Sequence, residues 1–236
     1  MNAEKNMTPR LLAIADCVSQ NVKIADVGTD HAYIPIYLVQ KGKISSALAM
    51  DINRGPLLRA ENNIAKFQLQ ENIVTRLSDG IKELKAGEAD EIIIAGMGGI
   101  LICEILEAKK ELLTKDVRLI LQPMTAAEEV RKYLHHNGFC IKEERLAKEG
   151  NKIYQILTAQ VGDMEVNREA DYYISPYLLT NHVPLAKEFL IFKIREFEKI
   201  LRGLTAAKRE NTHDREVYVR NLLDELYEIK EECGEW

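Results

Sequence analysis

Hydrophobic positions in the first two thirds of the chain form short apolar runs, separated by stretches in which apolar and polar positions alternate with helical spacing. The runs predict strands over residues 22–27, 46–51, 73–77, 91–95, 117–122, 139–146 and 153–159. The stretches between them predict helices over 34–41, 56–67, 100–108 and 126–136. Strands that alternate with helices form a parallel sheet covered on both faces, so we expect an α/β fold.

The last two predicted strands differ from the others, because only residues 147–152 separate them. No crossover helix fits into this length, so the two strands are expected to form an antiparallel hairpin. Five parallel strands that end in such a hairpin are typical of the Rossmann-like sheet of class I methyltransferases. The fold that binds dinucleotides is all-parallel and ends differently.

From residue 163 onwards the pattern becomes that of two long helices. Apolar residues recur at spacings of three and four, first at Leu190, Ile194, Phe197, Leu201 and Leu204, then at Val219, Leu222, Leu226, Ile229 and Cys233. Such narrow seams with charged flanks predict a C-terminal α-helical coiled-coil hairpin. The alternative is that both helices pack on the sheet. We therefore expect a catalytic domain over 1–162 and a helical coiled-coil domain over 163–236.

Composition narrows the class of protein further. Apolar residues make up 46% and charged residues 29% of the chain, no apolar run approaches the roughly 20 residues that span a bilayer, and the N-terminus is polar. We therefore expect a cytoplasmic protein without a membrane partner. The four cysteines are widely spaced, so neither a disulfide framework nor a metal site is expected. The net charge of −5 lies wholly in residues 163–236, so binding of a nucleic acid would need a local basic patch.

Polar residues and glycines follow the first predicted strand. Asp26 and Gly28 come at its end and Asp30 two residues later. Ligands of parallel sheets bind beyond the carboxyl ends of the strands. Two carboxylates there would repel the pyrophosphate of NAD or FAD but suit S-adenosylmethionine, which carries an ammonium and a sulfonium. Alternatively, Asp30 caps the following helix.

The next three strand ends continue this pattern. Asp51, followed by Ile52, is placed to accept hydrogen bonds from ribose hydroxyls, and Asp79 with Gly80 is placed at an adenine. The fourth strand runs into Gly96, Met97, Gly98 and Gly99. Glycine costs backbone entropy on folding, so three glycines among four residues indicate that a side chain would collide with something at this strand end. We expect a ligand to approach the backbone closely there. The alternative is a tight turn before a helix.

Four segments together resemble one known family. They are Asp-Val-Gly-Thr-Asp-His-Ala-Tyr-Ile-Pro at 26–35, Ala-Gly-Met-Gly-Gly at 95–99, Gln-Pro at 122–123 and Gly-Asn-Lys-Ile-Tyr at 150–154. They resemble the bacterial tRNA (adenine-22-N1)-methyltransferases, often called TrmK, over essentially the whole chain. The resemblance implies methyl transfer from S-adenosylmethionine to N1 of an adenine in tRNA. It implies that Asp26 and Gly28 contact the methionine end, Asp51 the ribose and Asp79 the adenine of the cofactor, and that Gly96 to Gly99 border the methyl group.

Candidate catalytic residues are Asp30, His31 and Tyr33. A base must leave its stack before it can react, so Tyr33 is a candidate to stack on the flipped adenine and His31 to orient it or relay a proton. The alternative for both rings is a packing role. Candidate substrate-binding residues are Arg10, Gln122, Pro123, Asn151, Lys152 and Tyr154.

The expected partner is tRNA, bound by a monomer or weak dimer. Candidate phosphate contacts on the rims of the cleft are Lys5, Arg10, Lys23, Arg54, Arg145, Lys148 and Lys152; candidates on the helical hairpin are Arg195, Lys199, Arg202, Lys208 and Arg209. The hairpin would clamp tRNA or mediate dimerisation. Two alternatives stay open: a methyltransferase acting on another RNA base or a small molecule, and a non-catalytic RNA-binding module.

Overall fold

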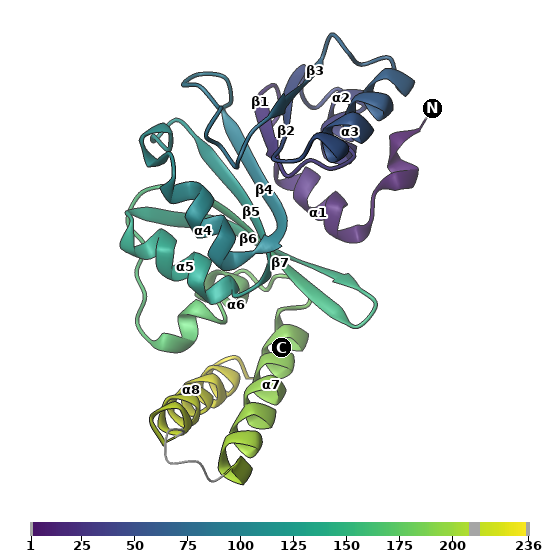
Figure 1. Ribbon diagram of the computed structural model, residues 1–236. Coiled ribbons are helices and arrows are strands. Elements are labelled where there is room, and N and C mark those ends of the chain that lie inside the picture. Colours follow the sequence, from purple (N-terminus) through teal and green to yellow (C-terminus); the bar gives the residue numbers. More distant parts are fainter. Residues whose placement is uncertain (1, 208–212, 235–236) are drawn as a thin grey trace. The chain divides into compact units, whose positions relative to one another are not determined.

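The computed structural model describes residues 2–207 and 213–234, which belong to two compact units, Met1–Met164 and Glu165–Trp236 (Figure 1). The first unit is built on a seven-stranded sheet with the order β3-β2-β1-β4-β5-β7-β6. The strands are β1 (Lys23–Val27), β2 (Ser46–Asp51), β3 (Ile73–Leu77), β4 (Glu91–Gly98), β5 (Arg118–Thr125), β6 (Phe139–Glu149) and β7 (Lys152–Val161). The first five are parallel, and β7 pairs antiparallel with both β5 and β6.

Helices cover both faces of the sheet. They are α1 (Pro9–Cys17), α2 (Tyr33–Gln40), α3 (Arg54–Lys66), α4 (Gly99–Glu107) and α5 (Ala127–His136), with 3-10 turns at Ala3–Asn6 and Lys110–Leu112. Because side chains of a strand alternate between faces, Ile24 and Ile93 join one apolar cluster with α1, α2 and α3, whereas Ala25 and Ile92 join the other with α4 and α5. The predicted Rossmann-like methyltransferase sheet, with its closing antiparallel hairpin, is confirmed.

The seven predicted strands and four predicted helices are present, with ends that shift by up to three residues. Strand β4 extends through the glycine segment to Gly98, and the β6-β7 hairpin continues to Glu149 and Lys152. Helix α1 was not predicted. It is short, begins with Pro9 at its first position, and the Thr8 hydroxyl accepts a hydrogen bond from the Leu11 amide at 3.4 Å as its N-cap.

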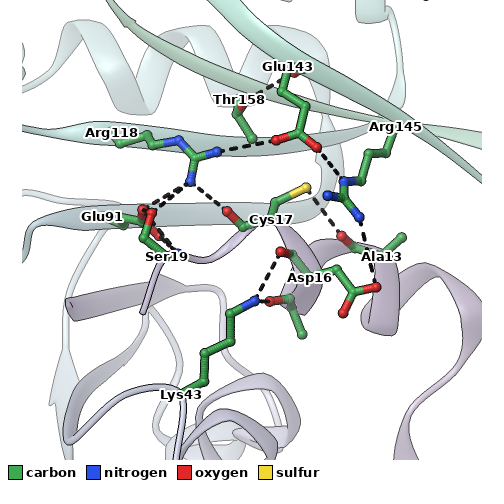
Figure 2. A network of polar contacts seen from close by, with 11 residues as sticks. Ala13, Asp16, Cys17, Ser19, Lys43, Glu91, Arg118, Glu143, Arg145 and Thr158 are labelled. Carbon is green, nitrogen blue, oxygen red and sulfur yellow. Dashed lines mark hydrogen bonds and ion pairs between the residues drawn. The ribbon is translucent and has the colours of Figure 1, made fainter. Parts of the chain in front are cut away.

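Helix α1 is anchored at its C-terminal end to the amino edge of the sheet (Figure 2). Arg118 donates to the Cys17 carbonyl at 2.5 Å and pairs with Glu91 at 3.0 Å. The Lys43 ammonium donates to the carbonyls of Ala15 and Asp16 at 2.9 and 3.0 Å. Cations that bind the last carbonyls of a helix satisfy groups that have no partner within it.

The second unit is helical, with a 3-10 turn at Glu169–Tyr172 followed by α6 (Pro176–Thr180), α7 (Ala186–Ala207) and α8 (His213–Glu232). Helices α7 and α8 are antiparallel neighbours, since Thr205 contacts Glu216 while the Tyr227 hydroxyl donates to Glu198. Seven of the ten predicted seam positions are buried, and the other three, Leu201, Leu204 and Cys233, are half-buried. Lys208 and Arg209 lie outside the described residues.

The apolar face of this helix pair is wider than a coiled-coil seam. Phe189 and Leu223 are also buried, and the Tyr173 ring meets Phe197 edge-on at 5.1 Å. The segment around Tyr173, which precedes α6, therefore packs on the helices of its own unit. The Tyr173 hydroxyl adds a hydrogen bond with the Tyr218 hydroxyl at 2.9 Å. A coiled coil stays a prediction.

Candidate active site

A cavity of about 310 Å³ opens at the carboxyl edge of the sheet in the first unit. Strand β1 lies between β2 and β4, so the chain order reverses beside it, and such switch points form the ligand-binding crevice of parallel sheets. The lining residues come from the end of β1, the β1-α2 loop, the start of α2, the end of β4 and the start of α1: Arg10, Leu11, Asp26, Gly28, Thr29, Asp30, His31, Tyr33, Ile34, Ala95 and Gly96. Seven of the predicted site residues thus share one cavity.

Asp26 carries a buried negative charge in this cavity. Its side chain is 5% exposed, and its carboxylate accepts a hydrogen bond of 2.6 Å from the Thr29 hydroxyl. Burial raises the pKa of Asp26 from 3.8 to about 6, the Thr29 hydrogen bond opposes this rise, and the neighbouring Asp51 adds to it. A cationic ligand would favour the ionised form and lower that pKa again.

The backbone at Gly28 adopts a left-handed conformation that favours glycine. Its φ is +75°, and a Cβ there would lie 2.2 Å from the terminal methyl of Met97. The amides of Gly28 and Thr29 both donate to the Met50 carbonyl, at 2.8 and 2.9 Å. The turn after β1 is therefore held against β2, with Met97 from β4 lying across it.

Asp30 does not cap the following helix, so that alternative is wrong. Helix α2 begins at Tyr33, its N-cap is Ala32 in the left-handed conformation, and no side chain caps it. Asp30 instead accepts hydrogen bonds from Arg59 of α3, at 2.6 Å from Nη2 and 3.1 Å from Nε. The negative charge of Asp30 is thus balanced by Arg59, whereas Asp26, at the end of β1, is contacted by the neutral Thr29 hydroxyl.

The rings of His31 and Tyr33 are stacked at the cavity. Their centroids are 4.9 Å apart and their planes differ by 6°. The Asp30 carboxylate lies 3.5 Å from Nε2 of His31, and the Asn63 side chain donates to the His31 carbonyl at 3.0 Å. Arg59 and Asn63 are four residues apart on α3, so one face of that helix supports the whole turn. Neither residue was predicted.

Arg10 reaches the cavity from α1 and contacts neutral groups. Its Nη1 donates to Oε1 of Gln122 at 2.7 Å, and its guanidinium lies 5.6 Å from the centre of the Tyr154 ring. Gln122 is fully buried, its Oε1 also accepts from the Gly96 amide at 3.2 Å, and its Nε2 donates to the Pro123 carbonyl at 2.9 Å. In this structure the Gln122 amide therefore serves to position Arg10.

The residues predicted at the nucleoside end lie along the ends of β2 and β3. Asp51 is 9% exposed and accepts a hydrogen bond from the Asn53 amide at 2.8 Å. Ile52 is exposed, and Asp79 pairs with Lys82. A Cβ on Gly80 would approach Ile105 to 2.9 Å, so packing against α4 already requires this glycine.

The three glycines at the end of β4 occupy different surroundings, so glycine is required for a different reason at each position. A Cβ at Gly99 would lie 2.1 Å from the Ala126 carbonyl oxygen, and one at Gly98 would lie 3.4 Å from the Thr125 hydroxyl. Close packing on the end of β5 thus explains Gly99, and α4 begins there. Gly96 has a φ of +78° and lies beside Arg10 in the cavity. Of the three glycines at the end of β4, Gly96 is the one that lines the cavity.

The remaining candidates are spread over the first unit. Asn151 and Lys152 are exposed at the turn of the β6-β7 hairpin, and Pro123 is buried beside Met97 in the sheet register. Lys23 lies at the start of β1, where its ammonium donates to the Gly87 carbonyl. Because that is the amino edge of the sheet, its predicted place on the rim of the cleft is wrong.

Within 2–207 and 213–234, no three His, Cys, Asp or Glu side chains are grouped so that they could hold a metal ion. In the same ranges, every helix is too short or too polar to cross a membrane.

The sheet order, the antiparallel closing hairpin and the acidic residues at the ends of β1 and β2 define a Rossmann-like methyltransferase. Residues 7–157 match the family model described as "Methyltransferase domain". The tRNA (adenine(22)-N(1))-methyltransferase of Bacillus subtilis is 33% identical over 233 residues, 97% of each chain. Its crystal structure, described as that of the M1A22 tRNA methyltransferase TrmK, matches with a TM-score of 0.84 over 93% of this chain and 98% of that one.

A second solved relative carries a ligand. TrmK from M. capricolum, in complex with the cofactor product S-adenosyl-homocysteine, is 26% identical and matches with a TM-score of 0.76 over 94% of this chain and 97% of that one. The chain belongs to the tRNA (adenine(22)-N(1))-methyltransferase family.

Proposed function

We propose that this chain transfers the methyl group of S-adenosylmethionine to N1 of adenine 22 in tRNA. The observation that carries the proposal is the pairing of two features in one cavity: the buried Asp26 carboxylate and the stacked His31 and Tyr33 rings. The first suits a cationic cofactor and the second a flat base. The relatives' names support both the reaction and the substrate.

The residues present fit S-adenosylmethionine. Asp26 is placed for the ammonium, and Gly28, with its positive φ, keeps the turn free of a side chain. Asp51 is placed for the ribose hydroxyls, with Ile52, Asp79 and Gly80 further along the same edge. When bound, this cofactor would supply a methyl group on a positively charged sulfur. The lone pair of the acceptor would bond to the methyl carbon while the carbon–sulfur bond breaks and leaves a neutral thioether. Gly96, Met97 and Gly98 border the position of transfer.

Adenine N1 has a free lone pair at neutral pH, so the chain does not need to remove a proton before attack. The ring gains positive charge during the reaction, and Tyr33 and His31 offer an electron-rich surface to it. Asp30, whose charge is balanced by Arg59, lies 3.5 Å from His31 and supports the position of that ring. In-line displacement depends on alignment, and a fixed ring pair supplies it.

The rest of the tRNA requires a wider surface. Pro123, Asn151, Lys152 and Tyr154 are proposed to lie on its side of the first unit, with Lys5, Arg54 and Lys148 as phosphate contacts. In the helical unit, Arg195, Lys199 and Arg202 are exposed on α7. Reversing these three charges to glutamate in the full chain should weaken tRNA binding and flatten its salt dependence, while affinity for S-adenosylmethionine is unchanged. Unchanged tRNA affinity would remove the helical unit from the interface.

Mapping the modified nucleotide tests the reaction itself. Unmodified tRNA is incubated with the enzyme and S-adenosylmethionine labelled in the methyl group, and the labelled nucleotide is identified after digestion. Label at N1 of adenine 22 is expected, and a tRNA with guanine at that position should take up none. Label on another base or on a small molecule would contradict the proposed substrate.

Tyr33→Ala tests the base-binding role. Loss of the stacking surface should reduce kcat on tRNA about 100-fold or more, since base-aromatic stacking contributes roughly 1–3 kcal/mol and alignment adds to it. Binding of S-adenosylmethionine, measured by calorimetry, should stay within about twofold. Tyr33→Phe keeps the ring and should retain most activity, and Tyr37→Ala, one turn further along α2, is the matched control. Equal turnover of Tyr33→Ala and wild type would discard the stacking role.

A further inference from the structure

Large apolar side chains are exposed where β4 and β5 end. Ile100 is 61% exposed, Leu101 46% and Met124 40%, and no other large apolar side chain within 2–207 and 213–234 is as exposed as Ile100. Ile100 and Leu101 lie in the first turn of α4, and Met124 is the last residue but one of β5. These three side chains are called the apolar lip below.

Packing of α4 on the sheet does not require the lip. The buried face of the helix is formed by Gly99, Ile102, Ile105 and Leu106, which recur at helical spacing. Ile100 and Leu101 lie outside that face, so polar residues at these positions would leave the core of the first unit intact. The exposed apolar surface therefore needs a reason other than the fold.

The backbone that carries the lip is fixed. A Cβ on Gly99 would lie 2.1 Å from the Ala126 carbonyl oxygen, so the first turn of α4 packs directly on the chain that follows β5. In the sheet register, Met97 is opposite Pro123 and Gly98 is opposite Thr125. The lip thus projects from a rigid surface, which lowers the entropy lost when a partner binds to it.

The lip continues the wall of the active-site cavity and carries no charge. Gly96 lines the cavity, and α4 begins at Gly99 on the same edge of the sheet. Residues 92–103 and 119–127 contain no Asp, Glu, Lys, Arg or His. Phosphates are bound by cations and polar donors, so an apolar surface beside a site for a nucleic acid suits the bases rather than the backbone.

The proposed substrate offers a matching apolar surface. An adenine must leave its stack before its N1 can react, and its departure exposes the faces of the neighbouring bases. Aliphatic side chains are the wedges that proteins insert between base steps of nucleic acids. Ile100 and Leu101 have the chemistry and the exposure that such an insertion requires.

We infer that the apolar lip enters the gap left by adenine 22 and so stabilises the tRNA with that base flipped towards His31 and Tyr33. Ile100 and Leu101 are the inserted side chains, and Met124 contacts a base beside the gap. The inference rests on the proposed function for the identity of the substrate, and it adds the residues that keep the stack open.

Two substrates test the insertion: unmodified tRNA, and the same tRNA with an abasic site in place of the nucleotide that pairs with adenine 22. The kcat of the full-length wild type is compared with that of the double variant Ile100→Ser, Leu101→Ser. The variant should be roughly 10- to 100-fold slower on unmodified tRNA, because flipping is no longer compensated, and within about threefold of wild type on the abasic tRNA, where the adenine leaves more easily. Equal loss on both tRNAs, or loss on neither, overturns the inference.

Fluorescence reports the flipping directly. 2-Aminopurine replaces adenine 22, and its emission rises when it leaves a base stack. With S-adenosyl-homocysteine present, wild type should raise the emission and the double variant should raise it less than half as much. Val161→Ser, at a 43% exposed position at the amino edge of the sheet, is the matched control and should behave as wild type does. A double variant that matches wild type contradicts the inference.

Three measurements exclude other roles of the lip. The Tm of the double variant should stay within about 2 °C of wild type, because both side chains are exposed. Its affinity for S-adenosylmethionine and its mass in sedimentation should be unchanged. A larger loss of Tm assigns the lip to the core, weaker cofactor binding assigns it to the cofactor, and a changed mass assigns it to a contact between two copies of the chain. Each of these results overturns the inference.

The outcome is distinct from that of the nucleotide mapping. If wild type labels adenine 22 and the double variant keeps the wild-type kcat on unmodified tRNA, the proposed function stands and the inference fails. If wild type labels a different base, and an abasic site opposite that base restores the rate of the double variant, the insertion holds and the proposed substrate fails.

Discussion

The two edges of the sheet in the first unit use charge in opposite ways. At the amino edge, Glu91 is 2% exposed and accepts hydrogen bonds from Ser19 and Arg118, and Arg118 in turn bonds the end of α1 (Figure 2). At the carboxyl edge, Asp26 is almost equally buried, yet the polar side chain that contacts it is the neutral Thr29. Similar burial thus goes with full pairing at one edge and an unmatched charge at the other.

This difference separates structural charge from charge kept for a ligand. Buried ions are tolerated when paired, because the partner offsets the loss of hydration. An unpaired buried carboxylate lowers stability and persists where a ligand supplies the missing charge. The thiol of Cys17, which lies in the network of the amino edge, follows the structural pattern: burial raises its pKa to about 12, and it donates to the Ala13 carbonyl. The comparison predicts opposite outcomes for carboxylate-to-amide changes at the two edges.

At the amino edge, Glu91→Gln should destabilise the protein by about 3 kcal/mol, because it leaves Arg118 partly buried with one close anion fewer. Chemical unfolding of the full chain, followed by circular dichroism, measures the change. Glu111→Gln alters an exposed carboxylate in the same unit and should change the unfolding free energy by less than about 0.5 kcal/mol. Equal effects of the two substitutions would show that the amino-edge network contributes nothing specific.

At the carboxyl edge, Asp26→Asn should stabilise the ligand-free protein. The folded-state pKa of Asp26 is about 6 against an ordinary 3.8, so the favourable contribution of its protonated form is full below pH 3.8 and lost as pH rises through 6. The gain of Asp26→Asn over wild type should therefore appear between about pH 4 and 6 and reach up to about 3 kcal/mol above that. Asparagine still accepts from Thr29. A pH-independent difference would contradict this, and Asp116→Asn, at an exposed site, serves as the control.

The affinity for S-adenosylmethionine should also depend on the ionisation of Asp26. A cationic ligand binds the ionised form of Asp26, so affinity for S-adenosylmethionine should fall about tenfold per pH unit below pH 6 and level off above it. Calorimetry from pH 5 to 8 measures the slope. Asp26→Asn should bind more weakly and lose the slope; a slope that survives in this variant would assign it to another group.

The sequence was informative where periodicity or strand-end position carried the signal. Short apolar runs predicted the seven strands, and the rule that parallel sheets bind ligands at their carboxyl ends predicted that Asp26, Gly28 and Asp30 lie at a ligand site. Sequence patterns failed where a residue is required by a packing partner that is distant along the chain. Gly99 is required by the Ala126 carbonyl and Gly80 by Ile105, and neither partner is visible in a local pattern.

Long-range pairing explains the remaining misses. Arg10 and Gln122 are 112 residues apart and meet because α1 packs against β5, β6 and β7. The short apolar pattern of α1 did not predict this helix. Lys23 was assigned to the cleft by its charge alone, although its position at the start of a parallel strand places it at the amino edge. Strand direction, which was already predicted, would have corrected that assignment.

The smallest expected effect concerns Arg59 on α3. Because Arg59 pairs with Asp30, the charges at this end of the cavity are paired, as they are at the amino edge of the sheet. Arg59 holds Asp30 at 2.6 Å, and Asp30 lies 3.5 Å from His31. Arg59→Met should leave Asp30 and the stacked rings less well aligned and lower kcat on tRNA about fivefold, with KM for S-adenosylmethionine unchanged, because a lost exposed ion pair contributes less than about 1 kcal/mol. Arg59→Lys should restore most of the rate. If KM for the cofactor rises while kcat stays the same, Arg59 supports cofactor binding, and Asp30 belongs with Asp26 among the charges kept for the ligand.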